Sequence, residues 1–222
     1  MTDGITLAAL NAALVSLDDV AGVETARRLL ECGVAPIEIM TACEKSLTEI
    51  GEKYARGEYF IAGLIMAGDL MSRIIELVTP RLVAGAETNS ARGRVLIGTV
   101  QGDIHGLGKN IAGALLSAYG FSVRDLGVDV VCEDFVRECR EFKPDIVGLS
   151  VLLSTCYPHL AETIRALREL RGQKEKPAIF ISGAQVTPQT KERYGADYYA
   201  ETAFDTVHLC QKLAGCDPPP PA

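Results

Sequence analysis

Hydrophobic residues in the first part of the chain recur at intervals of three and four, which is the spacing of helices that pack by one face. This spacing predicts helices over about 6–16 and 19–31, followed by two longer ones. Pro36 suits the first turn of the third helix, and Pro80 comes near the end of the fourth. Four helices joined by short connections predict a small bundle. The apolar positions of the two longer helices are Met40, Cys43, Leu47, Ile50 and Tyr54, and Ile61, Leu64, Gly68, Met71, Ile75, Val78 and Leu82.

Beyond residue 93 the pattern changes to short apolar runs that alternate with stretches of helical length, the last of them near 204–213. Strands separated by helix-length connections predict a parallel sheet with helices on both faces. Five such units predict an α/β domain with flavodoxin-like, or Rossmann-like, strand order. The apolar runs lie near 94–100, 122–126, 145–150, 178–182 and 197–199.

Residues 85–93 separate the two patterns, and their Gly, Thr, Asn and Ser content is typical of a linker. We therefore expect a helical bundle domain at 1–88 and an α/β domain at 89–215. The proline-rich end, 216–222, is expected to form an extended, disordered tail. At 222 residues and 48% hydrophobic, the chain is long enough to bury a core in each domain.

Charge and composition narrow the functional classes. The formal net charge of -7 and the lack of a Lys/Arg cluster argue against a nucleic-acid partner. No apolar run approaches the ~20 residues of a membrane span, and the chain does not start with a basic and then an apolar stretch. We therefore expect a cytoplasmic protein without a membrane partner. Seven cysteines without a Cys-x-x-Cys pair indicate neither a disulfide framework nor a zinc site.

The segment Gly102–Asn110 follows an apolar strand and opens a helix, which is where an open parallel sheet presents its ligand site. Asp103 and His105 stand two apart in extended chain, so their side chains leave the same edge. A carboxylate can hydrogen-bond one nitrogen of an imidazole while the other nitrogen faces a metal. Gly108 clears space at the start of the helix. An Asp and a His on a glycine-rich loop can also be ordinary turn residues, and that alternative stays open here.

Two nucleotide-binding motifs fail on spacing. A phosphate loop needs a glycine, then four other residues, then Gly-Lys-Ser/Thr. Asp103 stands where the first glycine belongs, and Asn110 replaces the hydroxyl residue. A dinucleotide fingerprint needs a third glycine at the position of Ile111.

Asp103-x-His105-x-x-Gly108 is also the signature of proteins that bind cobalamin with a histidine as the lower cobalt ligand. Two further parts of this signature, a Ser-x-Leu and a Gly-Gly, correspond to Ser150-Val151-Leu152 and Ser182-Gly183-Ala184, which follow later apolar runs. On these three motifs the chain resembles the corrinoid methyl-carrier proteins and the cobalamin-binding module of methionine synthase. It departs from the pattern by placing Ser182 at the first glycine of the Gly-Gly, which narrows the channel expected there.

The resemblance implies cobalamin as the cofactor, with its own base displaced from the metal into a channel. It implies His105 as the cobalt ligand and Asp103 as its hydrogen-bonded partner, and these two residues would serve the catalytic chemistry. The third member of this relay stays open among Ser154, Thr155 and Cys156. The cofactor-binding residues implied in this domain are Gly102, Asp103, Ile104, His105, Gly106, Leu107, Gly108, Ser150, Leu152, Ser154, Ser182, Gly183 and Ala184.

The segment 51–61 resembles the cap that covers the upper face of the corrin in these proteins. By that resemblance, Tyr54 and Ile61 lie over the corrin, with Phe60 beside them. An aromatic and an aliphatic residue at helical spacing can equally belong to the core of the bundle. The spacing alone does not separate the two interpretations.

The same resemblance implies a carrier that is not catalytic alone. It would pass a methyl group, held as methylcobalamin, from a substrate-specific methyltransferase to a second methyltransferase that methylates tetrahydrofolate or a thiol. A reductive activase is a further partner that it allows. The methyl donor stays open among methanol, a methylamine, a betaine and an aryl methyl ether.

Three alternatives share part of the pattern. A cobalamin-dependent sensor or regulatory protein has the same two domains but normally adds an output module. The small subunit of an adenosylcobalamin mutase shares the Asp-x-His-x-x-Gly domain but does not need the bundle. A cofactor-free interaction domain would leave the three motifs unexplained.

Overall fold

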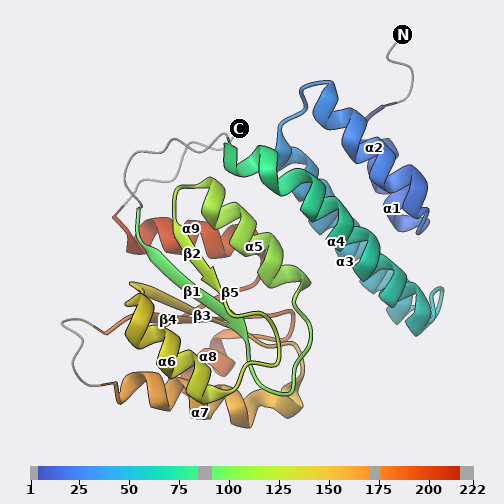
Figure 1. The fold of residues 1–222 in the computed structure, drawn as a ribbon. Coiled ribbons are helices and arrows are strands. Elements are labelled where there is room, and N and C mark those ends of the chain that lie inside the picture. The colour runs from blue at the N-terminus through green and yellow to red at the C-terminus, as the bar shows by residue number, and fades with distance from the viewer. Residues whose placement is uncertain (1–4, 85–91, 171–175, 216–222) are drawn as a thin grey trace. The chain divides into compact units, whose positions relative to one another are not determined.

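The computed structural model describes residues 5–84, 92–170 and 176–215, and the chain divides into two compact units, 1–85 and 86–222 (Figure 1). The boundary expected between residues 88 and 89 and the tail expected at 216–222 both lie outside the described residues.

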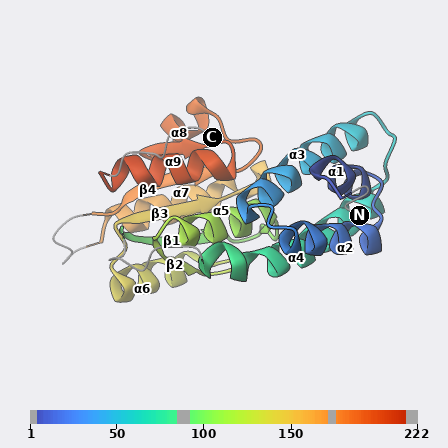
Figure 2. The same ribbon diagram turned by 90° about the horizontal axis from the view of Figure 1, so that it is seen from above.

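The first unit is a bundle of helices whose contacts form a closed ring (Figure 2). Helix α1 packs on α2 and α3, and α4 packs on the same two. The side chains of Thr6 and Asp18 cap α1 and α2 by accepting backbone N–H bonds. The predicted bundle is therefore confirmed, with Pro36 in the first turn of its helix and Pro80 near the end of its own. The helices are α1 (Leu7–Val15), α2 (Asp19–Glu31), α3 (Pro36–Ala55) and α4 (Ile61–Ala84).

The second unit contains a parallel sheet of the order β2-β1-β3-β4-β5. This is the flavodoxin-like order that the alternating pattern predicted. Five boundaries differ by one residue from the prediction: β1 and β2 each end one residue earlier, β3 begins one residue later, and β5 begins and ends one residue later. Val100, just after β1, makes only an isolated bridge with Val130. The strands are β1 (Arg94–Thr99), β2 (Ser122–Asp125), β3 (Ile146–Ser150), β4 (Ala178–Ser182) and β5 (Tyr198–Ala200).

Helices cover both faces of this sheet (Figure 1). On one face, α5 (Leu107–Ala118) packs against α9 (Ala203–Leu213), and on the other, α6 (Cys132–Phe142) packs against α7 (Tyr157–Arg168). A 3-10 turn, η1 (Ser154–Cys156), precedes α7, and α8 (Pro188–Tyr194) lies between β4 and β5.

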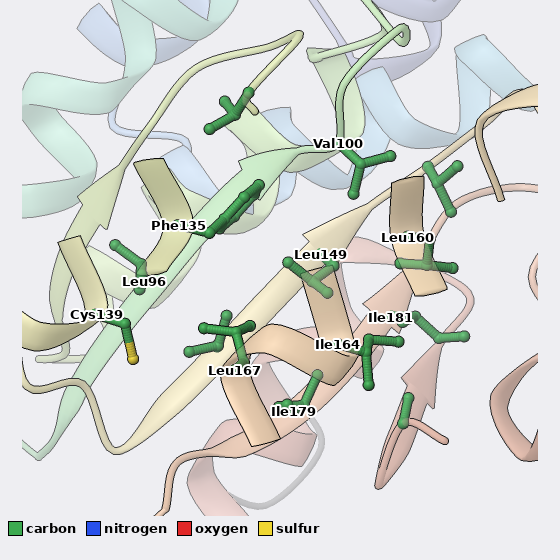
Figure 3. Close-up of a cluster of buried hydrophobic side chains, with 14 of the residues drawn as sticks. Leu96, Val100, Phe135, Cys139, Leu149, Leu160, Ile164, Leu167, Ile179 and Ile181 are labelled. Carbon is green, nitrogen blue, oxygen red and sulfur yellow. The ribbon is translucent and has the colours of Figure 1, made fainter. Parts of the chain in front are cut away.

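The core between the sheet and α6 and α7 is built mainly from aliphatic residues of the strands and of α7, with one fully buried aromatic, Phe135 of α6 (Figure 3). These residues remove nearly all of their apolar surface from water, at about 25 cal/mol per Å². This packing fixes where each strand ends and therefore where the loops at the carboxyl edge lie. The labelled members of this core are Leu96, Val100, Phe135, Cys139, Leu149, Leu160, Ile164, Leu167, Ile179 and Ile181.

None of the helices within the described residues is long and apolar enough to cross a membrane. Burial raises the pKa of the thiols of Cys43 and Cys210 to about 12, so both pack as small apolar residues.

Candidate functional site

The three motif segments meet at the carboxyl edge of the sheet. In the strand register, Thr99 at the end of β1 pairs with Ser150 at the end of β3, and Ser150 pairs with Ser182 at the end of β4. Loops that follow neighbouring parallel strands share one edge, which is the place where such sheets bind ligands. The structure therefore brings together the segments that the sequence predicted to converge.

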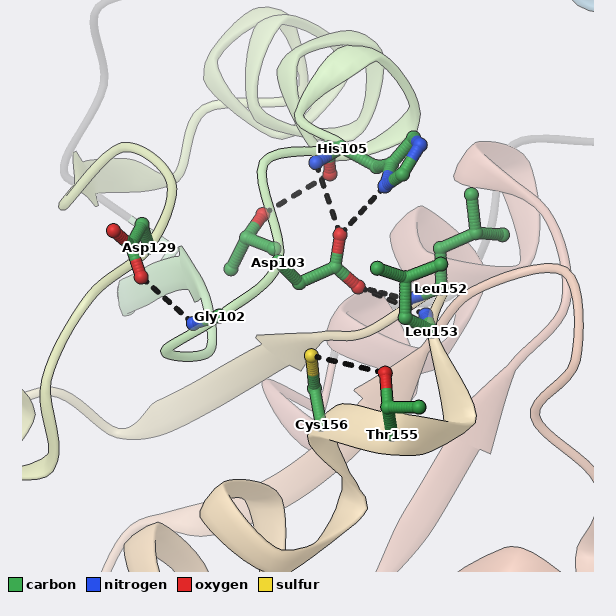
Figure 4. A network of polar contacts seen from close by, with 9 residues as sticks. Gly102, Asp103, His105, Asp129, Leu152, Leu153, Thr155 and Cys156 are labelled. Atoms are coloured by element: carbon green, nitrogen blue, oxygen red, sulfur yellow. Dashed lines mark hydrogen bonds and ion pairs between the residues drawn. The ribbon is translucent and has the colours of Figure 1, made fainter.

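Asp103 is fully buried, and its carboxylate accepts four hydrogen bonds (Figure 4). Its Oδ1 lies 3.0 Å from the backbone N of His105 and 2.7 Å from Nδ1 of the same residue. Its Oδ2 accepts the backbone N–H groups of Leu152 at 2.6 Å and Leu153 at 3.0 Å. These contacts use the acceptor sites of an ionised carboxylate, so the side chain has one fixed orientation.

The charge on Asp103 sets the state of the histidine. Burial by itself raises the pKa of Asp103, but the N–H groups of Leu153, Leu152 and His105 outweigh it and hold the pKa below its usual value of 3.8. A carboxylate only accepts hydrogen bonds, so the proton of the imidazole lies on Nδ1. The second ring nitrogen, Nε2, then keeps its lone pair.

His105 is open to a ligand, because its side chain is 49% exposed. Its backbone carbonyl accepts a hydrogen bond from the buried hydroxyl of Thr99 at 3.2 Å, which holds the loop against the end of β1. One imidazole offers one metal ligand, which suits an ion that arrives with other ligands in a macrocycle, as haem iron does. The residues present thus fit a macrocyclic metal cofactor.

The chain of hydrogen bonds that runs from His105 through Asp103 ends at the backbone N–H groups of Leu152 and Leu153. Among the described residues, no hydrogen bond joins Asp103 to the three side chains considered for the third member, Ser154, Thr155 and Cys156. Figure 4 shows Cys156 beside Thr155, with Sγ and Oγ1 3.9 Å apart. Sequence reasoning missed the two backbone donors because an N–H group is present at almost every residue and leaves no signature.

Two ion-pairing residues near the site were also missed. Lys109 lies in the first turn of α5, as expected, but its side chain is only 3% exposed. Its Nζ lies 2.6 Å and 2.5 Å from the two carboxylate oxygens of Asp125, whose Oδ1 also accepts the N–H of Gly127. A buried ammonium needs such a partner. The ion pair connects the start of α5 to the end of β2. An apolar residue in place of Lys109 would remove that connection.

The two glycines expected to make room for a ligand behave differently. A Cβ built on Gly108 meets nothing within 4 Å, so the space in front of this residue is open. A Cβ on Gly183, which has a φ of +143°, would lie 1.9 Å from the carbonyl oxygen of Val151. Gly183 is therefore required first by the protein's own backbone.

The residues predicted to face a cofactor from the bundle are exposed in the structure. The exposed fractions are 43% for Tyr54, 82% for Phe60 and 68% for Ile61. The alternative that these three belong to the core of the bundle is therefore wrong. Exposed apolar side chains continue along α4 with Ile65 and Met66.

Comparisons with known proteins agree with both units. A family model described as a B12 binding domain matches residues 93–208, and a second model with that description matches residues 6–79. The chain is 35% identical over 199 residues to a trimethylamine corrinoid protein of Methanosarcina barkeri, covering 88% of this chain and 90% of that protein. The chain belongs to the B12-binding corrinoid proteins.

Solved structures show the same fold as this corrinoid protein. The monomethylamine corrinoid protein of Methanosarcina barkeri matches it with a TM-score of 0.81 and 28% identity, over 92% of this chain and 96% of that chain. A chain of the methanol:cobalamin methyltransferase complex MtaBC of the same organism matches with a TM-score of 0.53 and 25% identity, over 97% and 81%. The cofactor of this corrinoid protein is cobalamin.

Proposed function

We propose that this corrinoid protein carries a methyl group between two methyltransferases and that Nε2 of His105 is the lower ligand of its cobalt. The half-exposed His105, held through Nδ1 by the buried carboxylate of Asp103, is the observation that carries the proposal. When bound, cobalamin supplies a cobalt ion that takes up and releases the methyl group. The protein supplies the orientation and the protonation state of the ligand.

The loop around His105 would border the lower face of the cofactor. Ile104 supports this role, because an aliphatic side chain that is 73% exposed gains stability when a ligand covers it. The open space at Gly108 supports close approach of the ligand to the start of α5. Gly102, Gly106 and Leu107 complete the loop.

The ends of β3 and β4 would receive the displaced base. Ser150 and Ser182 are half-buried neighbours in register, and neither hydroxyl has a hydrogen-bond partner among the described residues. Such hydroxyls can donate to a ring nitrogen or accept from a polar group. The remaining residues proposed for this channel are Leu152, Ser154, Gly183 and Ala184.

The partners proposed are a substrate-specific methyltransferase, a second methyltransferase that passes the group to tetrahydrofolate or a thiol, and a reductive activase. Similarity to a chain of a methanol:cobalamin methyltransferase complex supports the first of them. Relatives named for trimethylamine and monomethylamine indicate that the donor differs within the family. The pocket that selects the donor then belongs to the partner enzyme.

His105→Ala is expected to leave the fold intact and to remove a nitrogen ligand from cobalt. The side chain is half exposed, so its truncation should change stability by less than about 1 kcal/mol. The measurement is electron paramagnetic resonance of the cobalt(II) form in protein that contains histidine labelled with the heavy nitrogen isotope. The parent should show coupling that changes with the label. His159→Ala, on the exposed surface of α7, is the matched control and should keep this coupling. Coupling that persists in His105→Ala would refute the ligand assignment.

Tyr54 and Ile61 are proposed to cover the upper face of the bound cofactor. Because both are exposed, Tyr54→Ala combined with Ile61→Ala should cost far less than the about 2 to 5 kcal/mol of a core truncation. Cobalamin should stay bound, and its cobalt(I) form should be reoxidised faster. Stopped-flow absorbance measures this rate, and Val20→Ala on the exposed face of α2 serves as the control. An unchanged reoxidation rate would exclude Tyr54 and Ile61 as cover.

A further inference from the structure

The connection from β2 to α6, residues 126–131, runs beside the segment that bears Asp103 and His105. It is attached to the end of β1, because Thr99 N donates to the carbonyl oxygen of Gly127 at 3.0 Å and Val130 N donates to that of Thr99 at 2.9 Å. Val100 and Val130 form a parallel bridge one step further on. The connection therefore lies in a fixed position beside the loop that bears Asp103 and His105.

Asp129 of this connection holds the loop that bears Asp103 and His105 at two points. Its backbone N–H donates to the carbonyl oxygen of Asp103 at 2.9 Å. Its side-chain Oδ1 accepts the backbone N–H of Gly102 at 2.7 Å (Figure 4). The two hydrogen bonds hold the N–H of Gly102 and the carbonyl of Asp103, which are the two ends of this dipeptide. They therefore fix the direction in which the Asp103 side chain leaves the backbone.

Both hydrogen bonds of Asp129 depend on uncommon backbone conformations. Gly102 has a φ of +85° and Asp129 a φ of +53°, both in the left-handed region. Among residues with a side chain, Asp and Asn adopt this region most readily. An Asp at position 129 therefore adopts the left-handed backbone conformation with little strain. It also supplies the oxygen that accepts the N–H of Gly102.

We propose that Asp129 is a positioning residue for the cobalt ligand. It keeps the carboxylate of Asp103 aimed at Nδ1 of His105 through the main chain of Gly102 and Asp103. The amides of Leu152 and Leu153 hold the far oxygen of Asp103, and Asp129 holds its main chain. The inference rests on the proposed function, because it concerns the strength of ligation by His105.

Asp129→Gly tests this role without backbone strain, because glycine also adopts a left-handed φ. The variant keeps the backbone N–H and loses the oxygen that Gly102 uses. Outer partners of metal ligands typically change binding by about 10 to 100-fold. We expect the lower end, about tenfold weaker binding of histidine to cobalt(II). If cobalt(I) binds no histidine, that change raises the cobalt(II)/cobalt(I) midpoint potential by about 59 mV.

A second measurement uses the protein without cofactor. Ring-nitrogen NMR of His105 should show the Nδ1–H tautomer in the parent and a larger share of Nε2–H in Asp129→Gly. Asp129→Asn keeps an acceptor oxygen and a side chain suited to the left-handed region, so it should restore the parent tautomer and potential. Lys143→Gly is the matched control, because it removes a side chain from another left-handed residue, at the end of α6.

The outcomes separate this inference from the proposed function. A lower melting temperature in Asp129→Gly, with the tautomer and the potential of the parent, would show a merely structural role and overturn the inference. An effect of equal size in Lys143→Gly would overturn it as well. A parent protein whose cobalt(II) signal lacks histidine coupling would instead overturn the proposed function, whatever Asp129 does to the tautomer.

Discussion

Asp103→Asn is expected to weaken the proposed ligation of cobalt by His105, although the new side chain has almost the same shape. Asparagine has one acceptor oxygen where aspartate has two. If that oxygen keeps the N–H groups of Leu152 and Leu153, the amide NH2 faces Nδ1 of His105, which then has to accept. The proton moves to Nε2, the nitrogen proposed to bind cobalt. Retention of cobalamin should fall by about 10 to 100-fold.

The opposite orientation of the asparagine is no better, because its NH2 group would face two backbone donors. A buried N–H left without an acceptor costs about 1 to 3 kcal/mol. Urea unfolding of the cofactor-free protein should therefore show a loss of about 2 kcal/mol. Asp145→Asn is the control, because that carboxylate accepts one backbone N–H, from Arg94 at 2.7 Å, and asparagine can replace it there. Equal losses in both variants would contradict the special role of Asp103.

The stability difference between the parent and Asp103→Asn should depend on pH in the cofactor-free protein. The folded state lowers the pKa of Asp103, so it favours the ionised form. This stabilisation is complete above the unfolded-state pKa of 3.8 and is lost as the pH falls through the lower pKa of the folded state. The difference should therefore shrink on acidification. A difference that stays constant would mean that the charge of Asp103 does not stabilise the fold.

Gly183→Ala is expected to destabilise the α/β unit strongly. The added Cβ would lie 1.9 Å from the carbonyl oxygen of Val151, and a φ of +143° is itself unfavourable for alanine. Backbone strain and overpacking each cost about 1 to 3 kcal/mol, so together they should cost about 2 to 6 kcal/mol. Moving Val151 also displaces the neighbouring N–H of Leu152, so its hydrogen bond to the carboxylate of Asp103 should weaken. Thermal unfolding and cobalamin retention measure the two effects.

Gly195→Ala separates the clash from the backbone conformation. Gly195 ends α8 with a φ of +76°, and a Cβ there meets nothing within 4 Å. Alanine at this position should cost only the left-handed backbone term, about 1 to 2 kcal/mol. If both variants unfold at the same temperature, the contact between Gly183 and Val151 is not what makes glycine necessary.

Local pattern predicted the fold well, because most helices and strands bury a continuous apolar stripe of their own. The stripes of the bundle and the short runs of the sheet have different periods, so they are distinguishable along the chain. The Asp103–His105 contact was predictable for the same reason, since both residues lie on one short loop. The order of the strands followed from the alternation of strands and helices.

The supports of that contact were not predictable from local pattern. Asp129 lies on another loop, and Leu152 and Leu153 contribute only main-chain groups. The position of Asp129 in the loop that follows β2, at the edge already assigned to the ligand, was a usable signal. Gly183 was assigned to ligand space because its family motif suggests it, whereas its closest neighbour is the backbone of Val151. Such contacts depend on how strands approach one another in space.

The reach of the Asp103 carboxylate has a consequence for the order of assembly during folding. Leu152 and Leu153 lie 49 and 50 residues further along the chain, so their amides meet Asp103 only once β3 has docked beside β1. Closing so long a loop is slow compared with forming a helix. His105 therefore acquires the Nδ1–H tautomer, the one proposed to bind cobalt, late in folding, when most of the sheet exists. Uptake of cobalamin through His105 would thus select completely folded chains, and partly folded chains would remain without it.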